Sequence, residues 1–131
     1  MVAQLVAAGR AVRCFDPDQN IQQRMRAVGA QTKETLAELA QSSEVIILSL
    51  PNAQIVEAVM AELSDHVGTG AIILDTSTST PGTSQKMASL GKSKGFDFID
   101  GPVSGGPAAA NSGTMTMLMP VIQTRLRACV Q

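Results

Sequence analysis

Apolar runs and polar turns alternate along the chain and predict alternating strands and helices. The clearest run covers residues 44–50 (EVIILSL), which is almost unbroken and rich in β-branched side chains, as expected of a strand buried on both faces. Residues 71–75 (AIILD) have the same character. Residues 11–16 and 96–100 fit less strongly, because polar side chains interrupt them. The pattern therefore predicts four strands.

Apolar residues between these runs recur at helical spacing. Thr80 and Pro81 predict the N-cap and first residue of one helix, which fades at residues 91–95. Three further segments place apolar residues on one face that can cover a sheet: Ile21 with Met25 and Val28, Leu36 with Ala40, and Ile55 with Val59 and Leu63. This alternation favours an α/β fold with an open, doubly wound, mostly parallel sheet.

Length, charge and cysteine content limit the classes of protein to consider. With 131 residues and 44% hydrophobic content, the chain can bury one moderate core. Its formal net charge of -1 offers none of the basic excess that nucleic acid binding needs. No apolar run approaches the roughly 20 residues of a membrane span, so we expect a soluble, cytoplasmic protein. Cys14 and Cys129 form no CxxC pair and indicate no metal site.

An acidic residue follows the first predicted strand. A dinucleotide fold places a carboxylate there on the ribose hydroxyls, where it would repel a 2′-phosphate and favour NAD over NADP; Asp16 fits this role. Alternatively, Asp16, Pro17 and Asp18 simply turn the chain and cap the next helix. Position alone does not separate these two interpretations.

Polar groups follow the other three strands as well. Leu50, Pro51 and Asn52 lead into a helix whose N-cap we expect to be Asn52. The hydroxyls of residues 76–80 could contact a ribose or nicotinamide, or serve as loop and cap groups, which is the role we favour for Thr80. Residues 101–107 (GPVSGGP) suit a carboxylate through successive backbone N–H groups, or form only a glycine-rich turn.

The order of three segments resembles a known family. ILDTSTSTPGTS, then FDFIDGPVSGG, then SGTMTML are similar to the β-hydroxyacid dehydrogenases, which include 3-hydroxyisobutyrate dehydrogenase, tartronate semialdehyde reductase and the glyoxylate reductases, and which are related to 6-phosphogluconate dehydrogenase. VIILSLPN and VRCFDPD fit the same frame. The resemblance covers about residues 1–118 and implies an NAD-binding, Rossmann-like domain of a CH–OH oxidoreductase, with NADP as an alternative cofactor.

The resemblance also implies roles for individual residues. Asp16 would bind the adenosine ribose, and Leu50, Pro51 and Asn52 would lie along the cofactor. Ser77 and Thr78 would approach the nicotinamide ribose. The carboxylate of a small substrate would be held by three residues of the glycine-rich segment, namely Ser104, Gly105 and Gly106.

The chain also departs from the family's pattern. Val2, Leu5, Val6 and Gly9 look like the second half of a helix and its C-terminal glycine, and no GxGxxG loop is present. In the strand order 3-2-1-4-5-6, the absent first strand belongs between residues 11–16 and 44–50. We therefore expect two exposed strand edges, poor stability and self-association.

The predicted organisation is a partial nucleotide-binding domain at residues 1–118 followed by a divergent tail at 119–131. The family's catalytic lysine belongs to a second, helical domain, so we assign no catalytic residue here and expect this chain alone to be inactive. Two alternatives stay open: a non-catalytic module for protein association, and the product of a broken gene.

Overall fold

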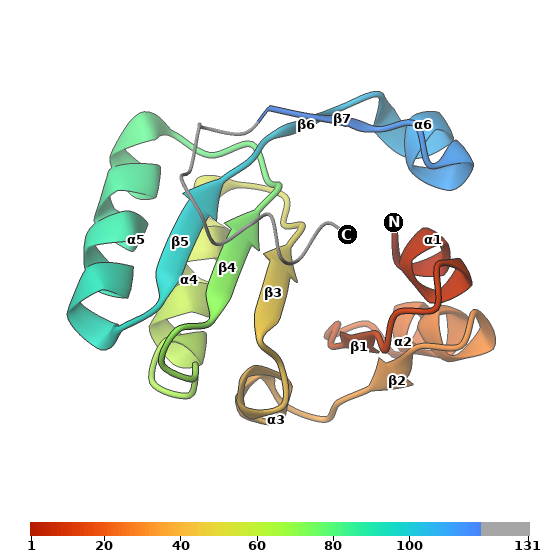
Figure 1. The fold of residues 1–131 in the computed structure, drawn as a ribbon, viewed down its shortest axis with the longest axis horizontal. Coiled ribbons are helices and arrows are strands. Elements are labelled where there is room, and N and C mark those ends of the chain that lie inside the picture. The colour runs from red at the N-terminus through yellow and green to blue at the C-terminus, as the bar shows by residue number, and fades with distance from the viewer. Residues whose placement is uncertain (119–131) are drawn as a thin grey trace.

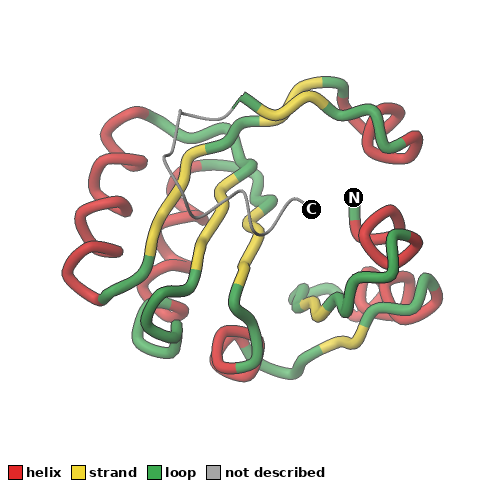
Figure 2. Tube along the Cα trace, in the orientation of Figure 1, coloured by secondary structure: helices red, strands yellow, loops and turns green. Residues whose placement is uncertain are grey.

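The computed structural model describes residues 1–118, in which helices and strands alternate (Figures 1 and 2). In chain order the elements are α1 (Val2–Ala7), β1 (Arg13–Cys14), α2 (Gln19–Ala27), β2 (Gln31–Thr32), α3 (Leu36–Gln41), β3 (Val45–Leu48), α4 (Ala53–Leu63), β4 (Ile72–Asp75), α5 (Pro81–Lys94), β5 (Asp97–Asp100), β6 (Val103–Ser104), α6 (Gly106–Ser112) and β7 (Thr116–Met117). The predicted α/β class is confirmed. The tail predicted at 119–131 lies outside the described residues.

Strands β3, β4 and β5 form a parallel sheet in that order, as the apolar runs predicted. Their register is even: Leu48 pairs with Asp75, and Asp75 pairs with Asp100. Because the strands are parallel and their last residues are level, the chain leaves all three strands at the same edge of the sheet.

A second parallel pair, β1 with β2, lies beside this sheet (Figure 1). The run predicted at residues 11–16 forms only a two-residue strand, and β2 was not predicted because Gln31 and Thr32 are polar and too short to give an apolar signal. The antiparallel pairing of β6 with β7 was also missed, since the segment around Val103 was interpreted as a turn.

Within residues 1–118, β1 is paired only with β2, and β3 is paired only with β4 on its inner side. On one face of β3, Val45 and Ile47 stay 38% and 37% exposed. These apolar side chains on an edge strand would favour contact with another polypeptide. A strand between β1 and β3 in longer relatives stays a prediction.

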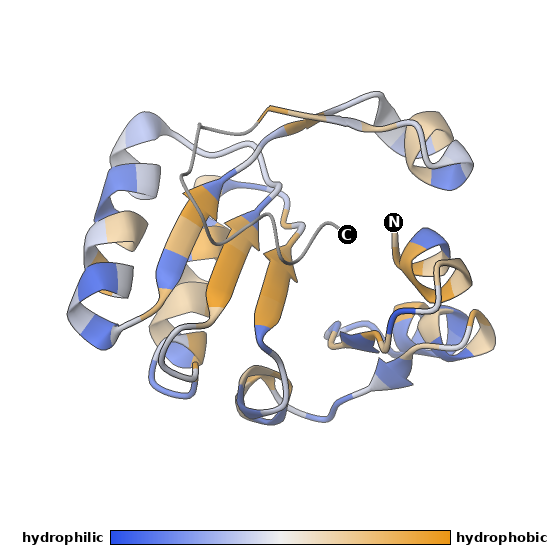
Figure 3. Ribbon diagram, in the orientation of Figure 1, coloured by the Kyte–Doolittle hydropathy of each residue, from blue (hydrophilic) through white to orange (hydrophobic). Residues whose placement is uncertain are grey.

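The main core lies between the three-stranded sheet and helices α4 and α5, and Figure 3 shows β3 and β4 as the most hydrophobic strands of that sheet. Met60, Leu63, Ile73 and Val56 are fully buried. The opposite face carries a smaller cluster of Ile72, Leu74 and Ile99, with Met117 against it. Both faces of β4 are therefore buried, which explains its continuous apolar sequence.

The face that α4 buries differs from the predicted stripe. Ile55 is 37% exposed and Val59 only half-buried, whereas Val56 and Met60 are fully buried beside Leu63. Spacings of i, i+4, i+8 and of i, i+4, i+7 both fit within one apolar stripe of a helix, so the pattern alone does not decide between them. The stripe Val56, Met60, Leu63 follows the second spacing.

Helix α5 begins as predicted and ends within the predicted segment 91–95. The Thr80 Oγ1 accepts the Thr83 N–H at 3.2 Å, and Pro81 is the first helical residue. The helix runs on through Gly91 to Lys94 and stops at Gly95, whose φ is +83°. Gly91 lies inside the helix, and glycine is required there because a Cβ would lie 2.7 Å from the Phe96 carbonyl oxygen. Glycine at this position therefore allows close packing and does not end the helix.

The two ends of the described chain meet through α1 and α6 (Figure 1). The Gln4 Nε2 donates to the Asn111 carbonyl oxygen at 2.6 Å. Helix α1 ends as predicted, with Gly9 at a φ of +75°. This contact links the β1–β2 half of the molecule to the segment that follows β5.

The buried face of α4 predicts that Met60 contributes more to the stability of the fold than Ile55, although the predicted stripe contained Ile55 and not Met60. Met60→Ala should reduce the free energy of unfolding by about 2–5 kcal/mol, because it leaves a cavity in the core. Ile55→Ala removes an exposed side chain and should cost less than about 1 kcal/mol. Urea unfolding followed by far-ultraviolet circular dichroism measures both, and equal costs would contradict the assigned core face.

Candidate nucleotide-binding site

Three loops leave the sheet at its carboxyl edge, which is where open α/β sheets bind ligands. They follow β3 at Leu50–Asn52, β4 at Thr76–Thr80, and β5 at Gly101–Pro107. The level ends of the strands place the starts of all three segments at one edge, although the segments are far apart in the sequence. The sequence-predicted residues 50–52 and 77–78 belong to the first two loops, whereas Ser104 ends the short strand β6 and Gly106 begins α6.

The first two loops are joined directly. The Leu50 N–H donates to the Ser77 Oγ at 2.9 Å. The preceding residue, Thr76, also binds the end of β3. Its N–H and its Oγ1 both donate to the Leu48 carbonyl oxygen, at 2.9 and 2.6 Å. The end of β3 is therefore fixed to the segment that follows β4.

A buried carboxylate organises the loop after β4. Asp75 is 0% exposed, and its Oδ1 accepts the Ser77 N–H at 2.9 Å while its Oδ2 accepts the Ser79 Oγ at 3.2 Å. Sequence reasoning assigned Asp75 no role. The available signal was an acid that ends an otherwise apolar strand, since such a group must be hydrogen-bonded where it is buried.

Asp100, which is level with Asp75, holds the start of α5. The Ser84 Oγ donates to the Asp100 Oδ2 at 2.5 Å. The next residue, Gly101, donates its N–H to the Asp75 carbonyl oxygen at 2.9 Å, and a Cβ on it would lie 2.8 Å from the Leu74 Cδ1. The end of β5 is thus tied to both α5 and β4.

The candidate residues differ in their exposure. Pro51, Asn52 and Thr78 are exposed and Leu50 is half-buried, whereas Ser77 is 4% exposed. Asn52 also caps α4 as predicted, because its Oδ1 accepts the Ile55 N–H at 3.0 Å. The side chain of Ser77 faces the protein rather than the solvent.

Asp16 forms a turn in the structure. Its Oδ1 accepts the Asp18 N–H at 2.8 Å, and Asp18 in turn caps α2 by accepting the Asn20 N–H at 2.8 Å. The turn-and-cap interpretation is therefore observed. Asp16 is half-buried, and no contact of its second oxygen, Oδ2, is seen among residues 1–118, so a ribose role stays a prediction.

The loop after β5 requires its glycines. Ser104 is opposite Thr116 in the β6–β7 pair, and Gly105 and Gly106 follow with φ values of +116° and +61°. A Cβ on Gly105 would lie 2.5 Å from the Ala109 Cβ. Ser104, Gly105 and Gly106 are all exposed, so a ligand could reach their polar groups.

Two other features lie away from these loops. A hollow of about 670 Å³ is lined by residues 40–45 and 68–72, at the amino ends of β3 and β4. Among residues 1–118, no three His, Cys, Asp or Glu side chains gather as metal ligands, and no helix is long and apolar enough to cross a bilayer. The carboxyl edge is the better candidate site, because open α/β sheets bind ligands there, whereas the hollow lies at the opposite edge of the sheet.

A family model decides the relationship: residues 1–126 match the NAD binding domain of 6-phosphogluconate dehydrogenase. The chain belongs to this family. The chain is 37% identical over 122 residues to 2-(hydroxymethyl)glutarate dehydrogenase of Eubacterium barkeri, a match that covers 91% of this chain and 40% of that protein. It is 31% identical over 122 residues to NAD-dependent L-serine dehydrogenase of Pseudomonas aeruginosa, with coverage of 91% and 41%.

A solved structure shows the same fold. Mycobacterium tuberculosis 3-hydroxyisobutyrate dehydrogenase, determined with L-serine, superposes with a TM-score of 0.93 at 26% identity, covering 98% of this chain and 44% of that one. The family resemblance and the Rossmann-like fold are confirmed. The chain spans about 40% of the length of the curated relatives that it matches.

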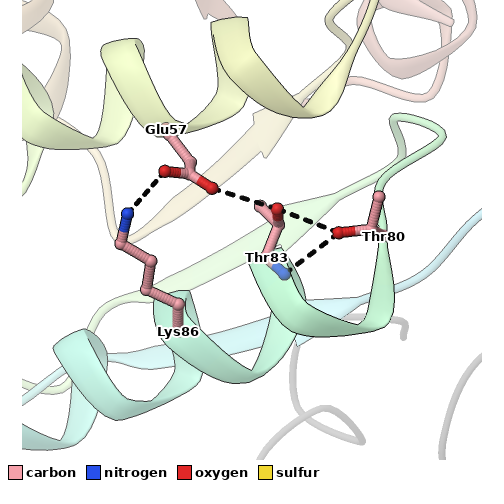
Figure 4. A network of polar contacts seen from close by, with 4 residues as sticks. All are labelled: Glu57, Thr80, Thr83 and Lys86. Atoms are coloured by element: carbon pink, nitrogen blue, oxygen red, sulfur yellow. Dashed lines mark hydrogen bonds and ion pairs between the residues drawn. The ribbon is translucent and has the colours of Figure 1, made fainter.

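In this member of the NAD-binding family, a polar network joins α4 to the start of α5 (Figure 4). The Thr83 Oγ1 donates to the Glu57 Oε1 at 3.1 Å and contacts the Thr80 Oγ1 at 3.1 Å, and Lys86 pairs with the Glu57 Oε2. The hydrogen bond from Lys86, followed by that from Thr83, lowers the pKa of the Glu57 carboxyl. The network holds the capped end of α5 beside the carboxyl edge of the sheet.

The lowered pKa of Glu57 predicts a pH-dependent contribution to stability. A carboxyl whose folded pKa is below its unfolded value, about 4.3, stabilises the fold above that pH, and the contribution is lost as pH falls through the folded pKa. Glu57→Gln should therefore lower stability at pH 7 and approach wild type near pH 3. Because Glu57 is solvent-screened, we expect a small effect.

Urea unfolding across this pH range measures the effect. Glu62→Gln, on an exposed position of the same helix, is the matched control and should not show the same pH dependence. A Glu57→Gln deficit that persists unchanged at pH 3 would contradict an ionic contribution.

Proposed function

We propose that the chain forms the NAD(P)-binding part of a dehydrogenase that moves hydride between nicotinamide and a short β-hydroxy acid. The observation that carries the proposal is the joined pair of loops at the carboxyl edge, in a chain that belongs to the NAD-binding family. The exposed amide and hydroxyl groups of Asn52 and Thr78 suit the hydroxyl-rich ribose of such a cofactor.

In this proposal, Leu50–Asn52 and the Ser77–Thr78 segment lie along the cofactor. Asp16 keeps its turn and binds the adenosine ribose through its second carboxylate oxygen, which favours NAD over NADP. The nicotinamide, when bound, supplies hydride transfer, and the protein orients it. The 131 residues contain no GxGxxG sequence, so we expect weak cofactor binding by these residues alone.

Ser104, Gly105 and Gly106 are proposed to hold the substrate carboxylate. Support comes from their exposure and from the glycines at positions 105 and 106, which carry no side chain of their own to cover their backbone N–H groups. Gly105 cannot be replaced without a clash against Ala109. A charged acceptor bound by backbone N–H groups forms stronger hydrogen bonds than a neutral one.

The relatives suggest the class of substrate. 2-(Hydroxymethyl)glutarate, L-serine and 3-hydroxyisobutyrate are the compounds in the relatives' names. Each carries a CH₂OH group on the carbon that bears the carboxylate. We infer a substrate with a primary hydroxyl in this position.

The cytoplasmic location expected from the sequence stays a prediction.

We expect the 131 residues alone not to catalyse the reaction, because the family resemblance places the acid/base lysine in a second, helical domain rather than in the nucleotide-binding domain. We expect no change of absorbance at 340 nm with 3-hydroxyisobutyrate, tartronate semialdehyde or glyoxylate and the matching form of either cofactor. Robust turnover would show that this part of the proposal is wrong.

Cofactor titration tests the binding function. Wild-type protein should bind NAD⁺ more tightly than NADP⁺, and Asp16→Asn should reduce that preference about tenfold by removing a charge that repels the 2′-phosphate, an effect of about 1.4 kcal/mol. Isothermal titration calorimetry at fixed ionic strength measures both affinities. Asp65→Asn changes the same charge at a site paired with Lys94, and should leave the preference unchanged.

A second candidate function is protein association through the edge of β3, which the exposure of Val45 and Ile47 favours. Size-exclusion chromatography beside the titration distinguishes the two functions. A defined oligomer that binds neither cofactor supports association, whereas cofactor binding by a monomer supports the dehydrogenase part.

A further inference from the structure

The side chain of Ser77 lies between two buried or half-buried partners, not at the surface. Its N–H donates to the Asp75 Oδ1, and its Oγ accepts the Leu50 N–H, each at 2.9 Å. Asp75 is 0% exposed and Ser77 4% exposed. One continuous chain of hydrogen bonds therefore runs from a carboxylate in β4 through Ser77 to the loop after β3.

Neighbouring contacts make this chain of bonds rigid. The second oxygen of Asp75 accepts the Ser79 Oγ at 3.2 Å, so the carboxylate fixes the loop at two residues. Thr76, between Asp75 and Ser77, is itself bound twice to the Leu48 carbonyl oxygen. Hydrogen bonds to a charged acceptor are stronger than neutral ones, and loss of one buried partner leaves the other unsatisfied.

The exposed neighbour has the opposite environment. Thr78 follows Ser77 directly and is exposed, and no hydrogen bond of its side chain is seen within residues 1–118. Its hydroxyl is available to a ligand at the carboxyl edge, whereas that of Ser77 is engaged with Leu50. The adjacent residues of the Ser77–Thr78 pair therefore have separate tasks.

We propose that Ser77, anchored by Asp75, is a positioning residue that sets the loop Leu50–Asn52 against the loop Thr76–Thr80, and that Thr78 is the residue of this pair that contacts the cofactor. The inference deepens the proposed function and rests on it. A ligand that lies across two loops binds best when their spacing is fixed before it arrives, because no binding energy is then spent on ordering them.

The test separates the two residues by two measurements on the full chain. The first is hydrogen exchange at the Leu50 amide without cofactor, followed by nuclear magnetic resonance. Ser77→Ala should speed this exchange about tenfold or more, since the amide loses its acceptor, while Thr78→Ala should leave it unchanged. Ser77→Thr keeps the hydroxyl and should restore protection.

The second measurement is the NAD⁺ dissociation constant. Ser77→Ala and Thr78→Ala should each weaken binding about tenfold, although only the first alters Leu50. Ser89→Ala is the matched control, because it removes a serine hydroxyl that bonds the Gln85 carbonyl oxygen within α5, away from both loops, and should change both measurements less than about threefold. Thermal unfolding identifies any variant that fails to fold.

The outcomes decide the inference separately from the proposed function. Faster Leu50 exchange with weakened binding in Ser77→Ala, beside unchanged exchange with weakened binding in Thr78→Ala, supports it. Unchanged Leu50 exchange in folded Ser77→Ala overturns it, as does unchanged cofactor affinity. A wild-type chain that binds neither NAD⁺ nor NADP⁺ overturns the proposed function and the cofactor part of this inference, while the exchange measurement still decides whether Ser77 couples the loops.

Discussion

The parallel, level pairing of β3, β4 and β5 is the constraint on which the rest of the molecule depends. Pairing of Leu48 with Asp75 and of Asp75 with Asp100 brings three strand ends to one line, so that polar loops distant in sequence meet at one edge. Packing of Ile73 against α4 and α5, and of Ile72 and Leu74 on the opposite face, supports that register, because a slip of one residue would exchange the side chains that the two faces bury. Site geometry and core packing therefore have the same origin.

The same edge concentrates polar groups that must be satisfied inside the protein. Asp75 is buried at the end of an apolar strand and is stabilised by the loop that it organises. Removing the Asp75 carboxylate would leave the Ser77 N–H without its acceptor and weaken the connection to Leu50, so the core and the loops are not independent units. A site built on such a shared group is held in place without any bound ligand.

The sequence predicted the parts of the fold that give strong periodic signals. Residues 44–50 and 71–75 contain β3 and β4, and Thr80 capped α5 as expected, because apolar runs and N-caps are local properties. It failed where tertiary contacts decide: β2 is too short and polar to stand out, and the burial of Met60 rather than Ile55 depends on how α4 is rotated against the sheet.

The candidate site shows the same division. Motif order located the loops, but exposure and hydrogen bonds assign different environments to Ser77 and Thr78, which are adjacent hydroxyl residues in the sequence. Asp75 was overlooked because an acid that ends an apolar run is a signal only if the acid is buried, and the sequence alone does not show its burial. Its importance follows from burial, which only the folded chain reveals.

The contact between α1 and α6 bears on the order in which the chain folds. The hydrogen bond from Gln4 to Asn111 spans 107 residues, whereas β3, β4 and β5 pair between neighbours joined by single helices. Contacts so distant in sequence carry a large loop-closure cost before they stabilise anything. We therefore expect the three-stranded sheet to form first and the two ends to join last, so that α1 and α6 separate at a lower free energy than global unfolding requires.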